Sequence, residues 1–351
     1  MIPDLGIIEG YYGRPWSDER REHAIAFLAP RGYRFFLYAP KADDFLRKRW
    51  REPCPAEGGA RLRRIAARCK ACGVRFGVGL SPYELYRDFS GDAKTALAER
   101  LALFDSVGVE MLAILFDDMR GDLPDLARTQ VDILHWIADR TKAQRLLMCP
   151  SYYTDDPVLD RVFGSRPANY LEDIGRLLDG RIEVFWTGEE VCAREYSAGH
   201  LARVGGQLRR KPFLWDNYPV NDGARMSQFL HLRAFTGRPA VIGEKLSGHA
   251  VNPALQPTLS LIPALTLIES YERGENYEYG AAFLRAAKTV LGDALAQLVQ
   301  SDLIALQDTG LDWLGDRVAR LRARYAAIDH PGAKEIVDWL DGQYRFTTEI
   351  A

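Results

Sequence analysis

The segment that decides the fold is Met111–Asp118, which reads MLAILFDD. Its continuous apolar run is typical of a strand buried within a parallel sheet, and two carboxylates follow where that strand would end. Similar short runs alternate along the chain with longer helical patterns. The eight predicted strands are Leu5–Glu9, Arg34–Ala39, Val74–Leu80, Met111–Phe116, Arg145–Cys149, Ile182–Trp186, Phe213–Asp216 and Ala240–Glu244. Eight such strands within about 240 residues predict an α/β fold of the closed (β/α)8 type, a TIM barrel.

The segments between these runs carry apolar residues at helical spacing, with acidic residues near their starts. Predicted outer helices are Asp18–Leu28, Ala60–Cys72, Asp92–Val107 and Asp125–Arg140. After about Ala254 no strand pattern remains, and Tyr279–Val299 and Leu311–Tyr325 read as amphipathic helices. We therefore expect a catalytic barrel over residues 1–260 and a helical C-terminal region over 261–351.

The composition excludes several classes of partner. The 351 residues include 46 basic and 48 acidic side chains, a formal net charge of −2 that gives no field for nucleic acid or an anionic membrane. No secretory segment precedes the first predicted strand, and no apolar run has the length of a membrane span. The five cysteines are sparse and odd in number. We therefore expect a cytoplasmic protein.

In a (β/α)8 barrel the active site lies at the carboxyl ends of the strands, so the residues after each run are the candidates. These residues are mainly paired carboxylates, aromatics and amides. No HxH or HExxH spacing, phosphate-binding glycine loop or nucleophile elbow occurs, so we expect neither a metal nor another cofactor. Carboxylates beside aromatic and amide groups favour a neutral, hydroxyl-rich substrate, which indicates a sugar.

Asp117 and Asp118 are the strongest catalytic candidates, because glycoside cleavage needs a proton donor and a second group that stabilises the cationic anomeric centre. Adjacent residues are too close to lie on either side of a sugar as an ordinary acid and nucleophile. This spacing favours substrate assistance, in which the 2-acetamido oxygen of the sugar attacks the anomeric carbon and forms an oxazoline intermediate.

Several motifs resemble those of glycoside hydrolase family 84, which contains the O-GlcNAcases and bacterial β-N-acetylglucosaminidases. The resemblance extends from Gly6 to about Asn252. The motifs are Gly10–Trp16, Tyr38–Lys41, Trp50–Glu52, Phe116–Asp118, Trp186–Gly188, Trp215–Asn217 and Asn221–Asp222. The resemblance implies a retaining β-N-acetylglucosaminidase that releases terminal β-linked GlcNAc from a glycoside or glycoprotein.

The resemblance also implies roles for individual residues. Asp117 would orient and polarise the acetamido group, and Asp118 would act as acid and then base. The remaining residues implied to bind substrate are Gly10, Lys41, Asp222 and Asn252 at the sugar hydroxyls, Tyr153 and Asn217 around the acetamido group and anomeric centre, Trp215 at the N-acetyl methyl, and Tyr12 beside them. Tyr11, Ala42 and Tyr152 depart from the family pattern, which leaves the leaving-group preference open.

Two other functions remain open from the sequence. One is a non-catalytic sugar-binding or scaffold barrel whose helical tail forms an interaction surface, although a binder has no need of a proton donor. The other is hydrolysis of a different 2-acetamido sugar such as GalNAc, which depends on how Asp222 meets the 4-hydroxyl. The apolar tail helices and the resemblance also suggest a homodimer.

Overall fold

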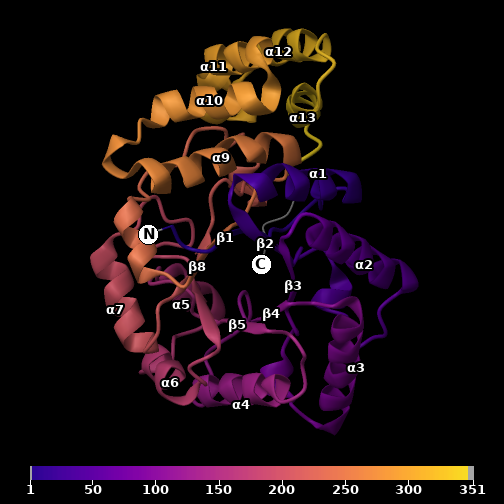
Figure 1. Ribbon diagram of the computed structural model, residues 1–351, viewed down its shortest axis with the longest axis vertical. Coiled ribbons are helices and arrows are strands. Elements are labelled where there is room, and N and C mark those ends of the chain that lie inside the picture. The colour runs from indigo at the N-terminus through magenta and orange to yellow at the C-terminus, as the bar shows by residue number, and fades with distance from the viewer. Residues whose placement is uncertain (1, 347–351) are drawn as a thin grey trace.

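The computed structural model describes residues 2–346 and contains a closed barrel of eight parallel strands in the order β1 to β8 (Figure 1). The strands are β1 (Leu5–Glu9), β2 (Tyr33–Tyr38), β3 (Arg75–Leu80), β4 (Met111–Leu115), β5 (Arg145–Cys149), β6 (Glu183–Trp186), β7 (Phe213–Asp216) and β8 (Gly248–Val251). The barrel closes where β1 pairs with β8, with Leu5 opposite His249. The predicted (β/α)8 fold is therefore confirmed.

The predicted eighth strand, Ala240–Glu244, is wrong. Ala240–Lys245 forms a 3-10 helix in which Val241 is 52% exposed, and the true strand follows it as Gly248–Val251. The true strand escapes a search for apolar runs because it is short and contains a glycine and a buried histidine. Gly248 is required there, since a Cβ on this residue would overlap the ring of Phe213 inside the barrel.

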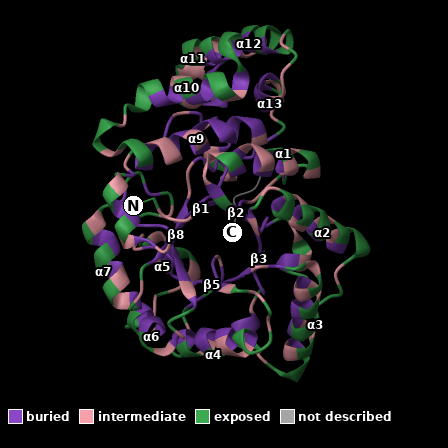
Figure 2. Cartoon of the chain, viewed as in Figure 1, coloured by how far each residue is buried: buried purple, intermediate pink, exposed green. Residues whose placement is uncertain are grey.

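An outer ring of helices surrounds the barrel (Figure 1). The ring contains α1 (Asp18–Leu28), α2 (Ala56–Ala71), α3 (Gly91–Val107), α4 (Leu126–Ala138), α6 (Tyr170–Leu177), α7 (Ala198–Leu208) and α9 (Pro257–Arg273). Their buried sides face the sheet, and the exposed sides of all but α9 face outward (Figure 2). Two shorter helices, α5 (Val158–Phe163) and α8 (Gly223–Met226), follow β5 and β7. Helix α1 begins as expected for a capped helix, with the Ser17 side chain accepting a hydrogen bond from the Arg20 N–H.

The C-terminal helices form a layer beyond α9 on one side of the barrel (Figure 1). They are α10 (Tyr279–Leu291), α11 (Asp293–Gln307), α12 (Arg317–Ala326) and α13 (Pro331–Leu340). The helix predicted over Tyr279–Val299 is in fact two helices, because Gly292 has a φ of 77° and ends α10. In place of the helix predicted over Leu311–Tyr325, a short 3-10 turn at Leu311–Trp313 precedes α12.

The predicted domain boundary at residue 260 falls inside α9, which packs against α1 on the barrel and against α10 and α13 in the tail. Met1 and residues 347–351 of the two predicted regions lie outside the described residues. The division into two domains stays a prediction. Across residues 2–346, the helices are too short or too polar to cross a membrane.

The tight fit at Gly248 gives a test of the barrel interior. We expect Gly248→Ala to lower the free energy of unfolding by about 1–3 kcal/mol, because the added methyl group forces the Phe213 ring out of its place. Gly206→Ala is the control. Gly206 is an exposed residue of α7 with open space around its Cα, so alanine should stabilise the protein by about 0.5–1 kcal/mol. Urea unfolding of both variants measures the difference, and equal effects would contradict this account of the interior.

Candidate active site

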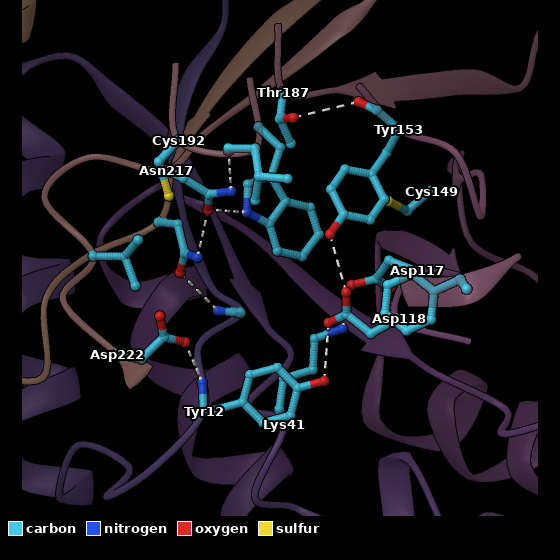
Figure 3. Close-up of a pocket in the computed structure, with 16 residues that line it drawn as sticks. Tyr12, Lys41, Asp117, Asp118, Cys149, Tyr153, Thr187, Cys192, Asn217 and Asp222 are labelled. Carbon is cyan, nitrogen blue, oxygen red and sulfur yellow. Dashed lines mark hydrogen bonds and ion pairs between the residues drawn. The ribbon is translucent and has the colours of Figure 1, made fainter. Parts of the chain in front are cut away.

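The ten residues proposed from the sequence lie around one cavity of about 210 Å³ (Figure 3). They come from segments at the carboxyl ends of the strands, and they are Gly10, Tyr12, Lys41, Asp117, Asp118, Tyr153, Trp215, Asn217, Asp222 and Asn252. The cavity is smaller than those that hold drug-sized ligands, so it suits a single small ring.

Asp117 follows β4 and forms an ion pair with Lys41 from the end of β2. Lys41 Nζ lies 2.5 Å from Asp117 Oδ2, and the two side chains are 2% and 7% exposed. Lys41 Nζ also lies 5.8 Å from the centre of the Trp215 ring. The second carboxylate oxygen, Asp117 Oδ1, is buried and has no hydrogen-bond partner within residues 2–346. Such an acceptor is costly unless a ligand supplies a donor.

Asp118 is held by two phenols. Tyr12 donates to Asp118 Oδ2 at 2.9 Å, and Tyr153 donates to Oδ1 at 3.0 Å. Burial, and then the charge of Asp118, raise the pKa of both hydroxyls, so each tyrosine stays protonated and remains a donor. Asp118 has a φ of 55°, a left-handed conformation that is uncommon outside glycine. This turn directs two successive carboxylates into the same cavity.

An amide network forms another wall of the cavity. The Trp215 Nε1–H and the Asn252 Nδ2–H both donate to Asn217 Oδ1, at 3.0 and 2.9 Å. Asn252 Oδ1 in turn accepts from the Gly10 N–H at 3.2 Å. A Cβ on Gly10 would overlap the Trp215 ring, so only glycine allows this approach. The network fixes the orientation of both amide side chains.

Asp222 lies across the cavity from Asp118 (Figure 3). Its Oδ2 accepts from the Tyr12 N–H at 2.8 Å, so Tyr12 connects the two carboxylates through its main chain and its hydroxyl. Burial raises the pKa of Asp222 to about 6. The hydrogen bond from the Tyr12 N–H opposes this rise, and the negative charge of Asp118 adds to it.

A second ion pair lies outside the cavity and supports its wall. Asp216, at the end of β7, accepts from Arg238 at 2.6 Å and lies 3.0 Å from His249 Nε2 on β8. Burial alone would raise the pKa of Asp216, but Arg238 and His249 outweigh it and lower that pKa. Burial lowers the pKa of His249. These contacts join the end of β7, which Asn217 follows directly, to a residue near the start of β8.

Sequence reasoning missed six residues that also line the cavity: Cys149, Phe163, Thr187, Val191, Cys192 and Val220. Cys149 and Thr187 lie at the carboxyl ends of β5 and β6, where candidates were sought. Thr187 also belongs to the motif Trp186–Gly188, but no role was assigned to it. The other four lie in loops or at a helix end, where no sequence signal marked them.

Trp186 is fully buried and donates to His200 Nε2 at 2.9 Å, outside the cavity lining. Among residues 2–346, no cluster of three His, Cys, Asp or Glu side chains is arranged to hold a metal ion.

Comparisons with known proteins point to one family. Residues 5–306 match the family model described as beta-N-acetylglucosaminidase. The mouse and rat proteins named protein O-GlcNAcase are each 30% identical over 258 residues, 71% of this chain but only 28% of theirs. A solved mutant O-GlcNAc hydrolase of Thermobaculum terrenum is 28% identical, with a TM-score of 0.81 over 97% of this chain and 81% of that one.

The Lys41–Asp117 pair can be tested by stability alone. Lys41→Met leaves the buried Asp117 carboxylate without its cation, so we expect a loss of about 3–5 kcal/mol in the free energy of unfolding. Adding Asp117→Asn removes the uncompensated charge and should restore more than half of that loss. Urea unfolding of both single variants and the double variant gives the coupling energy. Additive effects would show that the two groups do not interact.

Proposed function

We propose that this chain, which belongs to the beta-N-acetylglucosaminidase family, glycoside hydrolase family 84, hydrolyses terminal β-linked GlcNAc with retention by substrate-assisted catalysis. The observation that carries this proposal is the buried Asp117 Oδ1, an acceptor to which residues 2–346 supply no donor, inside a cavity of single-ring size. The N–H of a 2-acetamido group is the donor that it fits.

In the proposed first step, Asp117 accepts the acetamido N–H through Oδ1, while Lys41 holds Oδ2. This hydrogen bond increases the electron density on the acetamido carbonyl oxygen, which attacks the anomeric carbon. The bond to the aglycone oxygen breaks as Asp118 donates its proton to that oxygen. The products of this step are the released alcohol and an oxazoline in its protonated form, an oxazolinium ion whose N–H stays hydrogen-bonded to Asp117 Oδ1.

In the second step Asp118 takes a proton from water, and the water oxygen attacks the anomeric carbon. The bond to the acetamido oxygen breaks, and GlcNAc leaves with its original β configuration. The two phenols favour this change of role. Tyr12 and Tyr153 hold the Asp118 carboxylate in one orientation as a base. When Asp118 carries a proton on one oxygen, its other oxygen still accepts from a phenol, so the side chain keeps its orientation.

We propose that Asp222, Asn252, Lys41 and the Gly10 main chain form the hydroxyl-binding wall of the pocket, with Tyr12 beside them. Trp215, Asn217 and Tyr153 would enclose the acetamido group. The names of the relatives suggest O-linked GlcNAc on protein as the physiological substrate. The cytoplasmic location rests on the composition and stays a prediction. A homodimer through the tail helices is a further proposal.

The two aspartates should differ in their dependence on the leaving group. With a poor aryl leaving group, we expect Asp118→Asn to lose about 10²–10⁴-fold in kcat, because the departing oxygen receives no proton. With a leaving group that needs no proton, most of that loss in the glycosylation step should disappear.

Asp117→Asn should lose about 10²–10³-fold with both leaving groups, because it lacks the charged acceptor for the acetamido N–H. Steady-state rates on paired aryl GlcNAc and GalNAc glycosides measure both effects. If the wild type turns over neither sugar, the sugar-binding alternative is favoured. If the better leaving group rescues Asp117→Asn, Asp117 is the proton donor and Asp118 holds the acetamido group.

The raised pKa of Asp222 predicts an acid limb in the pH profile of kcat/KM. Asp222 accepts sugar hydroxyls best as a carboxylate, so activity should fall as the pH drops through about 6 and Asp222 gains a proton. In Asp222→Asn the overall kcat/KM is lower, and the limb at about pH 6 should be absent. The profile of kcat/KM between pH 4.5 and 8, roughly one to two units around this pKa, measures it. A limb unchanged in Asp222→Asn would assign it to another group.

A further inference from the structure

Helix α13, the fourth of the tail helices, and the residues that follow it support three loops, which follow β1, β7 and β8. Each of these loops carries part of the proposed hydroxyl-binding wall. The loop after β1 carries Gly10 and Tyr12, the loop after β7 carries Asp222, and the loop after β8 carries Asn252. In the fold these loops are neighbours, because β1 pairs with β8 and β8 with β7.

The contact with the loop after β7 is a buried hydrogen bond. Trp339 of α13 donates its indole N–H to the carbonyl oxygen of Ser227 at 3.1 Å. Ser227 ends the short helix α8, and Asp222 stands at the other end of that helix as its N-cap residue. Trp339 is 1% exposed, so this bond has little competition from water.

The contact with the loop after β8 is a helix cap supplied from a distant part of the chain. Both carboxylate oxygens of Glu335 accept main-chain N–H bonds at the start of α9, from Thr258 and Leu259 at 2.9 Å each. These N–H groups are among those that a helix leaves unpaired at its first turn. Glu335 therefore fixes where α9 begins, and with it the end of the loop that carries Asn252.

The contact with the loop after β1 is made by the residues that follow α13. The ring of Phe346 lies where a Cβ on Gly13 would be, and the Arg14 guanidinium lies 6.0 Å from the centre of the Tyr344 ring. Gly13 and Arg14 come directly after Tyr12. Tyr12 connects Asp118 and Asp222 through its hydroxyl and its N–H.

The loop that carries Asp117 and Asp118 lies after β4, on the other side of the barrel in strand order. Within residues 2–346, no hydrogen bond joins α13 to that loop. The hydrogen bonds from α13 to the pocket segments are thus confined to one side of the pocket.

We propose that α13 and the residues Tyr344–Phe346 position the hydroxyl-binding wall of the pocket, and so set how well the enzyme recognises the sugar hydroxyls without taking part in proton transfer. This inference rests on the proposed function. Glu335, Trp339 and Phe346 are positioning residues, since each acts through a loop and touches no substrate.

The test uses Trp339→Phe, which removes the indole N–H and keeps an aromatic ring in the core. Phe346→Ala is the second variant, and its half-buried side chain can be shortened without leaving a buried polar group. Tyr325→Phe is the matched control. It also removes one donor from a buried aromatic of the tail, but its 2.9 Å bond to Asp302 joins α12 to α11 and no barrel loop.

The readout is the ratio of kcat/KM for an aryl GlcNAc glycoside to that for its 4-deoxy analogue, measured in each variant. A hydroxyl held by a charged acceptor should give the wild type a ratio of about tenfold or more. We expect Trp339→Phe and Phe346→Ala to reduce this ratio by about threefold or more, mainly through KM, because the sugar hydroxyls meet a loosened wall. The dependence of the rate on the leaving group should stay as in the wild type, and Tyr325→Phe should leave both quantities unchanged.

A ratio equal to that of the wild type in both variants would overturn the proposal, as would an equal reduction in Tyr325→Phe. If Trp339→Phe does not fold, the comparison of Phe346→Ala with Tyr325→Phe decides. If the wild type turns over no GlcNAc or GalNAc glycoside, the proposed function fails separately. In that case the readout is the ratio of the dissociation constants for GlcNAc and 4-deoxy-GlcNAc, measured in each variant by calorimetry.

Discussion

Lys41 and Asp117 meet almost without access to water, and the chemistry of the pocket depends on this ion pair. The lysine compensates the charge of Asp117 and occupies one of its oxygens, which leaves the other oxygen as an acceptor inside the cavity. The carboxylate of the next residue, Asp118, accepts from two neutral phenols, and the Arg47 guanidinium contacts only the main-chain oxygen of Asp118. Two identical side chains in adjacent positions thus have different surroundings, and different surroundings are what allow two carboxylates to take different roles.

The sequence predicted the barrel and the position of the candidate site because both depend on local patterns. Apolar runs such as Met111–Leu115 identify buried strands, and the polar residues after them meet at one end of any parallel barrel. The ten candidates therefore converge on one cavity although they lie far apart in the chain. The eighth strand was misplaced because tertiary packing specifies it. Gly248 and His249 fit only against Phe213 and Asp216, which a scan for apolar runs does not detect.

Contacts between residues far apart in the chain could not be predicted from the sequence either, because tertiary packing specifies them. Arg238 lies in a loop, and nothing near it in the chain indicates that it pairs with Asp216. Val191 and Val220 reach the cavity only because their loops fold over it. No individual helix or role was predicted around Glu335, yet this residue caps α9 from α13. In each case the partner is far away in sequence, so no spacing rule applies.

The order of elements along the chain has a consequence for how the protein is made. Helix α13 follows every strand of the barrel, so a ribosome produces the acid pair and all eight strands before it produces Glu335 and Trp339. Domains fold as units while synthesis proceeds. A nascent barrel would therefore present Asp117 and Asp118 before the loops around Asp222 and Asn252 have their support from α13. This side of the pocket is therefore completed last, once the tail has been translated and has docked.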